Sequence, residues 1–164
     1  MVRQTRSTSY SDQGSFKRAL GLLSGDGLSG AEMLIERELE RNPESWEAMA
    51  AKADIYYLKE KYAEALEFCD RSLKVNSKNA FTWNTKGNAL YKMGRYDEAI
   101  ECYDRAIEAE PLFVRAWYNK KLALEVQLQK ATKKLSLIRL KGRDERDSKR
   151  EGDGSLRTRN NRSK

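Results

Sequence analysis

Histidine is absent from this sequence of 164 residues, and proline occurs only twice, at Pro43 and Pro111. The lack of histidine removes the commonest general base and the commonest metal ligand together. The two cysteines, Cys69 and Cys102, form no CxxC motif, which favours buried, reduced thiols over a redox or zinc site. We therefore expect no catalysis, no cofactor and no metal ion.

Long apolar runs are also missing. No stretch approaches the ~20 apolar residues of a membrane span, and residues 1–14 lack the apolar core of a signal peptide. We therefore expect a cytoplasmic protein with no membrane partner. Hydrophobic residues make up 39% of the chain and charged residues 35%, a balance that predicts a thin, extended core or a smaller domain with solvated tails.

Positive charge is unevenly distributed. Residues 1–113 hold 16 Lys and Arg against 19 Asp and Glu, a net charge of −3, whereas residues 114–164 hold 16 against 6, a net charge of +10. The basic character therefore belongs to the C-terminal third, where contact with nucleic acid or an acidic protein is possible. No aromatic residue follows Lys141, so stacking on bases is not available there.

An internal repeat of 34 residues organises most of the chain. Segments 46–79 and 80–113 carry identical residues at eight positions, where chance would give about two. These are Lys52/Lys86, Tyr57/Tyr91, Tyr62/Tyr96, Glu64/Glu98, Ala65/Ala99, Glu67/Glu101, Asp70/Asp104 and Arg71/Arg105. The echo extends backward to about residue 12 and forward to about residue 126.

Each repeat has the pattern of two helices. In 80–113, apolar residues recur at helical spacing before Gly94, and a second helical pattern runs from Tyr96 to Ile107. Pro111 then separates this repeat from the next. A single pair of this size cannot bury its apolar face alone, so the pairs must stack on one another.

These residues resemble the tetratricopeptide repeat. The pattern consists of Trp83, Lys86, Gly87, Leu90, Gly94, Tyr96, Ala99, Tyr103, Ala106 and Pro111, with Lys86 and Leu90 standing where the family commonly has Leu and Tyr. Segment 46–79 matches more loosely, with Ser77 in place of the proline, and segment 12–45 matches through its second helix. The resemblance implies an all-α, right-handed solenoid of three such helix pairs plus a long C-terminal capping helix.

The domain boundaries follow from the same period. We expect a flexible N-terminus at 1–11, a degenerate repeat at 12–45, full repeats at 46–79 and 80–113, a capping helix at 114–141 and a disordered basic tail at 142–164.

The resemblance implies that the first helix of each pair lines a concave groove, which binds a peptide or helix of a partner protein. The residues it assigns to the groove are Asp54, Tyr57, Leu58, Asn84, Thr85, Asn88, Tyr91, Lys92, Arg115, Tyr118, Asn119 and Leu122. Asparagine can bond a peptide backbone, and tyrosine offers apolar area with a polar tip. An ordinary hydrated surface is the alternative.

Two other site hypotheses are weaker. Some members of the family hold a C-terminal carboxylate through Lys and Asn, but this chain has Ala50 and Asp54 in the first of those places, so such a clamp is not expected. The segment Gly25–Gly30 spells GxGxxG, but no βαβ pattern surrounds it, and a dinucleotide loop needs that setting.

The last helix carries a heptad-like seam. Leu124, Leu128, Ala131, Leu135 and Ile138 follow spacings of four and three residues. We therefore consider a homodimer through Leu128, Leu135 and Ile138, and, as the alternative to a protein-binding scaffold, a nucleic-acid accessory protein that uses the basic helix and tail.

Overall fold

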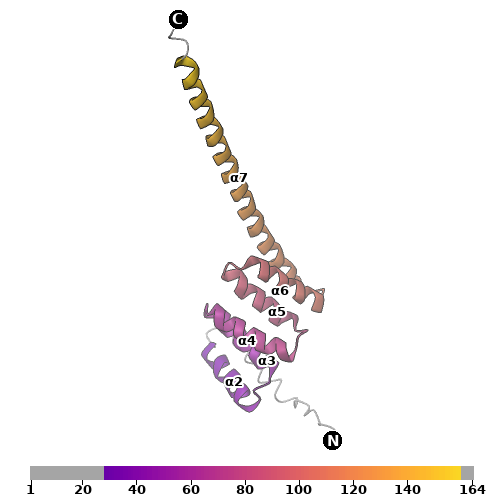
Figure 1. Ribbon diagram of the computed structural model, residues 1–164. Coiled ribbons are helices and arrows are strands. Elements are labelled where there is room, and N and C mark those ends of the chain that lie inside the picture. The colour runs from indigo at the N-terminus through magenta and orange to yellow at the C-terminus, as the bar shows by residue number, and fades with distance from the viewer. Residues whose placement is uncertain (1–27, 160–164) are drawn as a thin grey trace. The chain divides into compact units, whose positions relative to one another are not determined.

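The computed structural model describes residues 28–159, with side chains through Arg143 and at Arg146 (Figure 1). This part of the chain contains helices and no strand, which confirms the all-α prediction. The helices are α2 (Leu28–Arg41), α3 (Trp46–Leu58), α4 (Tyr62–Val75), α5 (Ala80–Lys92), α6 (Tyr96–Ala109) and α7 (Val114–Arg159). The N-terminal segment 1–11 and the first helix expected in repeat 12–45 lie outside the described residues.

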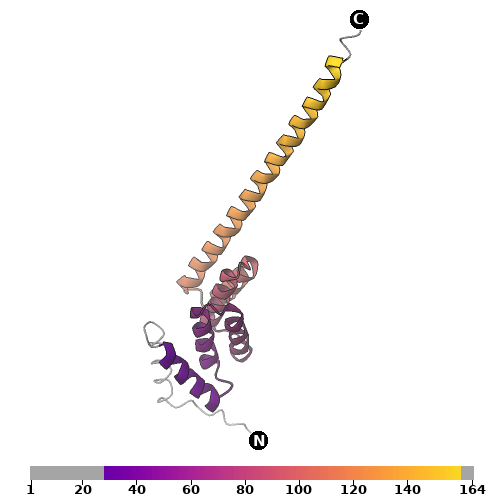
Figure 2. The same cartoon turned by 90° about the vertical axis from the view of Figure 1, so that its left-hand side faces the viewer.

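Two compact units divide the chain. One ends at Ala123 and the other begins at Leu124; we call residues 28–123 the repeat body and residues 124–159 the C-terminal segment. Within the repeat body, α3 packs beside α4 and α5 beside α6, and successive helices from α2 to α6 contact one another (Figure 1 and Figure 2). Stacking of successive pairs is the arrangement that a 34-residue period predicts.

The turns between repeats have the same geometry in each copy. The backbone N–H of Ser45 donates to the Asn42 carbonyl, Asn79 to Asn76, and Phe113 to Glu110, at intervals of 34 residues. Ser77 occupies the place that proline holds in the other two turns. Ser45 and Asn79 then cap the following helices, each accepting a hydrogen bond from a backbone N–H three residues on.

The core is built from small residues on facing helices. Alanines such as Ala31, Ala65 and Ala99 are completely buried, which lets neighbouring helices approach closely. At Gly87 of α5, a Cβ atom would lie 2.5 Å from the Tyr103 ring of α6. A glycine is therefore required at this position for the ring of Tyr103 to fit.

Ion pairs and indole bonds repeat along the stack. Lys52 pairs with Glu36, Lys86 with Asp70 and Lys120 with Asp104, always sixteen residues back and in steps of 34. The indole nitrogens make a second series: Trp83 Nε1 donates to the Ser77 carbonyl at 2.8 Å and Trp117 Nε1 to the Pro111 carbonyl at 3.0 Å. The repeats are thus equivalent in specific contacts as well as in backbone.

Helix α7 differs from the expected capping helix in its length. We expected it to end at Lys141 with a disordered tail after it, whereas it continues to Arg159, and residues 160–164 lie outside the described residues. No proline interrupts residues 142–159, and eight of these eighteen residues are Arg, Lys or Glu, which have high helix propensity, whereas the three glycines, Gly142, Gly152 and Gly154, have low propensity. Its first turns belong to the repeat body, where Ala116 and Ala123 are buried against residues of α5 and α6.

Candidate functional site

Three asparagine side chains meet on one side of the repeat body. Asn84 and Asn88 lie one turn apart on α5, and Asn119 lies on α7. The Nδ2 group of Asn119 donates to Oδ1 of Asn84 and to Oδ1 of Asn88, each at 2.9 Å. Asn84 is only 7% exposed, and the other two are half-buried. We call this group the asparagine network; it holds polar groups in fixed positions on a helical scaffold.

Tyr103 of α6 also forms a hydrogen bond with the asparagine network. Its hydroxyl donates to Oδ1 of Asn88 at 3.0 Å. Burial raises the pKa of Tyr103, so the hydroxyl stays protonated and remains a donor at neutral pH. Because the Asn88 carbonyl oxygen already accepts two hydrogen bonds, the N–H groups of the same amide are the donors that it can offer to a ligand.

The preceding repeat makes the corresponding contact with different residues. Thr85 Oγ1 donates to Oδ1 of Asp54 at 2.7 Å, and both residues lie 34 positions before Asn119 and Asn88. Burial raises the pKa of Asp54 to about 6, although the hydrogen bond from Thr85 acts in the opposite direction. Asp54 is therefore an interior carboxyl group that loses its proton only near neutral pH.

A cavity of about 240 Å³ opens beside the asparagine network. Its lining comes from α3, α5, α6 and the first turns of α7, and consists of Tyr57, Asn88, Tyr91, Lys92, Tyr103, Asn119 and Leu122. Sites for small molecules usually measure roughly 300–1,000 Å³. This cavity is too small for a dinucleotide but has room for one side chain of a peptide.

Two tyrosine pairs and one lysine determine the character of the rim. Tyr57 packs against Tyr62 with ring centroids 5.8 Å apart, and Tyr91 packs edge-on against Tyr96 at 5.2 Å. Burial raises the pKa of Tyr57, and the positive charge of Lys92, which lines the same cavity, opposes that rise. The rim thus combines aromatic area with one exposed positive charge.

Comparison with known families agrees with the period of 34 residues. Two family models described as tetratricopeptide repeat match the chain, one at residues 80–112 and one at residues 16–80. Together they cover residues 16–112, which is more than half of the sequence. The chain belongs to the tetratricopeptide repeat family.

Solved tetratricopeptide repeat domains share the fold at low identity. The Sgt2 domain from Aspergillus fumigatus gives a TM-score of 0.68 at 18% identity, covering 80% of this chain and 88% of that one. The first domain of human RPAP3 gives 0.67 at 16% identity, with 74% and 95% covered. The first domain of Spaghetti (RPAP3), solved with the HSP90 peptide SRMEEVD, gives 0.65 at 16% identity, with 76% and 98% covered. No curated protein matches the chain.

The groove residues assigned from the tetratricopeptide pattern fall into three groups. Those that line the cavity are Tyr57, Asn88, Tyr91, Lys92, Asn119 and Leu122. Those that do not line the cavity but form hydrogen bonds within the repeat body are Asp54, Asn84 and Thr85. Those that are exposed and do not line it are Leu58, Arg115 and Tyr118. Sequence reasoning missed Tyr103, because its helical spacing indicated only packing.

The other kinds of site considered from the sequence can be compared with the described part of the chain. Gly25 to Gly27 of the GxGxxG segment lie outside the described residues, whereas Ser29 and Gly30 form part of helix α2. Among the described residues, no group of three or more Cys, Asp or Glu could hold a metal ion. Burial raises the pKa of Cys69, and that of Cys102 to about 11, so both thiols are protonated at neutral pH. No helix of the described part is long and apolar enough to span a membrane.

Proposed function

We propose that the chain is a non-enzymatic protein-interaction module that binds a short extended peptide of a partner protein across α3, α5 and the first turns of α7. The observation that carries the proposal is the cavity beside the asparagine network, where fixed amide groups, three tyrosines and a lysine surround a hollow the size of one side chain. Peptide-binding grooves combine these features, with backbone bonds for affinity and a pocket for specificity.

Each group on the rim has a distinct role in this proposal. The N–H groups of Asn88 donate to a carbonyl oxygen of the peptide backbone, while Tyr57 and Tyr91 pack against a side chain that enters the cavity. Lys92 favours an acidic residue next to that side chain, because its ammonium group is exposed at the rim. The preferred ligand is therefore an extended peptide with one apolar residue beside an acidic one.

A C-terminal carboxylate is not the preferred ligand. Spaghetti (RPAP3) was solved with SRMEEVD, and the second human RPAP3 domain with the HSP70 peptide SGPTIEEVD. In this chain, the carboxyl group of Asp54 lies beneath the groove on α3 and titrates at a pKa of about 6. Above that pH a second carboxylate nearby is opposed by like charge.

Selection from a random peptide library tests the proposal. Selected peptides should contain the apolar–acidic pair and should bind Lys92→Glu much more weakly than the unmutated chain. Lys78→Glu is the matched control, because this exposed lysine lies in the turn between α4 and α5. Equal binding to both variants would contradict the proposal, as would amide chemical-shift changes that avoid the cavity-lining residues. SRMEEVD serves as a second probe, with its C-terminus either free or amidated, and we expect the free C-terminal carboxylate to give no gain in affinity.

A further inference from the structure

The C-terminal segment presents a narrow apolar stripe to solvent. Leu128 is 66% exposed, Leu135 65% and Ile138 57%. In a heptad labelled a to g, Leu128 and Leu135 take position a, whereas Ala131 and Ile138 take position d. We call these four residues the seam. Apolar residues that recur at positions a and d are the pattern of a helix that packs on another helix.

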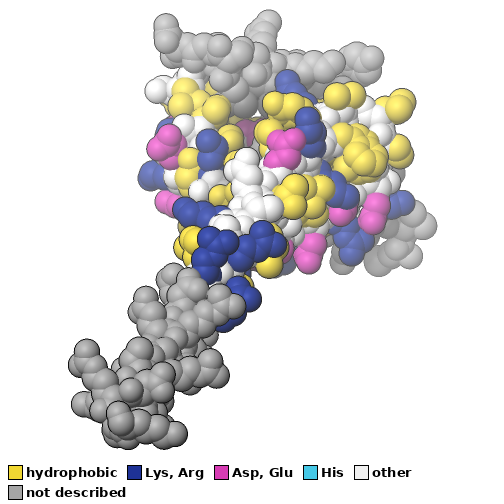
Figure 3. Space-filling model, turned by 90° about the horizontal axis from the view of Figure 1, so that it is seen from above, with side chains coloured by type: hydrophobic (Ala, Val, Ile, Leu, Met, Phe, Trp, Pro, Cys, Tyr) yellow, Lys and Arg dark blue, Asp and Glu magenta, His cyan; other side chains and the backbone are white. Residues whose placement is uncertain are grey.

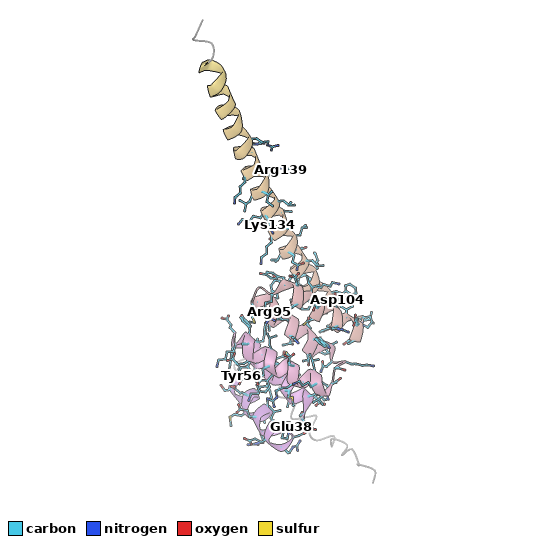
Figure 4. All side chains as sticks on the ribbon, in the orientation of Figure 1. Glu38, Tyr56, Arg95, Asp104, Lys134 and Arg139 are labelled. Atoms are coloured by element: carbon cyan, nitrogen blue, oxygen red, sulfur yellow. The ribbon has the colours of Figure 1, made fainter. Side chains whose placement is uncertain are left out.

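Positive charges flank the seam on both sides. Lys134 and Lys141 occupy position g, and Arg139 occupies position e, the positions that face a partner's charges in a coiled coil. No acidic residue occurs between Glu125 and Asp144, so Lys134 and Arg139 have no acidic residue within four positions on their own helix. Figure 3 shows Lys and Arg gathered around this helix, and Figure 4 labels Lys134 and Arg139 on it.

Pairing of two identical seams is opposed in both orientations. In a parallel pair, position g of one helix faces the following e position of the other, so Lys134 meets Arg139. In an antiparallel pair, g faces g, so Lys134 meets Lys134 or Lys141. Like charges meet in both cases, and the homodimer considered from the sequence is therefore the less favourable arrangement.

A flat anionic surface also fits the helix poorly. Leu137 and Leu140 take positions c and f, away from the seam, and are 52% and 56% exposed. A helix lying on a membrane normally has its apolar residues on one wide face, with aromatic residues among them. Here the apolar face is narrow, and the stretch 126–143 contains no aromatic residue.

We propose that the seam binds an acidic amphipathic helix of a partner protein as a short coiled coil. Apolar residues at a and d of the partner pack against Leu128, Leu135 and Ile138, while glutamates at e and g pair with Lys134, Arg139 and Lys141. Charge complementarity selects this partner, because acidic flanks turn each repulsion of the self-pair into an attraction. This surface is separate from the peptide groove proposed above.

A designed peptide of three heptads with Leu at a and d and Glu at e and g is the probe, titrated onto the full chain. We expect binding that weakens as salt rises. Lys134→Glu with Arg139→Glu should weaken it about tenfold, since two exposed attractions become repulsions. Lys133→Glu with Arg143→Glu makes the same change of charge at positions f and b, and should leave affinity nearly unchanged.

Two further measurements sharpen the test. A peptide with Lys at e and g should bind the Lys134→Glu, Arg139→Glu variant and not the unmutated chain. Leu128→Glu with Leu135→Glu should abolish binding of the acidic peptide, with circular dichroism checking that the helices remain. Equal weakening by the two double charge variants would overturn the proposal, because it would show that the peptide is attracted by overall charge and does not pack along the seam. So would an unmutated chain that sediments as a dimer, or one that binds anionic vesicles or RNA but not the acidic peptide.

Discussion

The two full repeats, 46–79 and 80–113, have the same arrangement of helices and differ in the side chains that are buried between them. Where the first has Ala53 and Cys69, the second has Gly87 and Tyr103 at the equivalent positions. All four residues are buried. A larger residue on the second helix thus coincides with a smaller one on the first. The cavity therefore depends on the pairing of Gly87 with Tyr103, because Tyr103 fills the space at Gly87 and its hydroxyl donates to Asn88.

Truncating the larger buried residue of each repeat, Tyr103 or Cys69, should give the greatest difference in stability between the two repeats. Tyr103→Ala deletes a buried ring and should cost about 3–5 kcal/mol of unfolding free energy. The equivalent change, Cys69→Ala, deletes one atom and should cost about 1 kcal/mol. Urea unfolding of both variants measures the difference. Comparable losses would mean that the repeats are packed alike despite their sequences.

The polar contacts of the two repeats should differ in their response to pH. The folded state holds the pKa of Asp54 at about 6, above its ordinary value of 3.8. A raised carboxyl pKa means that stability is fully present below about pH 4 and is lost as pH rises through 6. Asp54→Asn, which makes this site resemble Asn88, should therefore stabilise the chain at pH 7 by up to about 3 kcal/mol.

The same variant should give no stabilisation at pH 4, where the carboxyl group of Asp54 is largely protonated in the folded state. Thermal unfolding at both pH values, with and without the substitution, checks this expectation. A stabilisation of the same size at pH 4 and pH 7 would show that the effect has another cause.

Exchanging the smaller buried residue, Gly87 or Ala53, should reduce stability strongly in the second full repeat and mildly in the first. Gly87→Ala places a Cβ atom 2.5 Å from Tyr103 Cε1 and should destabilise by about 1–3 kcal/mol. Ala53→Gly should cost about 0.5–1 kcal/mol, the usual effect of glycine in a helix. In the Tyr103→Ala background the penalty of Gly87→Ala should disappear. Additive losses in that double variant would show that the ring is not the obstacle.

The smallest difference lies in the turn within each pair. Glu60 has a φ of 59° and the equivalent Gly94 a φ of 78°, a region in which a side chain is strained. Glu60→Gly should therefore stabilise by about 0.5–1 kcal/mol, after allowing for the greater freedom of glycine in the unfolded chain. Gly94→Glu should destabilise by a similar amount. Melting temperatures that moved in the same direction for both variants would contradict this account.

Much of the fold could be predicted because the same residue types recur every 34 residues and make equivalent contacts in each repeat. Pairs such as Tyr57 with Tyr91 fix the period, and the period fixes which helices are neighbours. The end of α7 could not be predicted in the same way. Beyond Lys141 the apolar pattern stops, and helix propensity and hydration favour opposite outcomes for a charged stretch.

The candidate site could be predicted in part. Asn88 and Lys92 share a helix face because they are four residues apart, and both line the cavity. The burial of each side chain was not predictable from that spacing, because Asn84 lies on the same face but is buried and bonded to Asn119 of α7. Tyr103 was missed because helical spacing gives the direction of a side chain and not whether its polar end reaches a cavity.

The contacts of the repeat body link each helix mainly to its neighbours along the chain, with few links over longer distances. Amide hydrogen exchange in such a stack should report separate openings of adjacent helix pairs rather than one event for the whole molecule. A peptide lying across α3, α5 and the first turns of α7 would touch successive repeats at once. Its occupancy should slow exchange in helices that it does not touch, because no pair beneath it could then open without releasing the ligand.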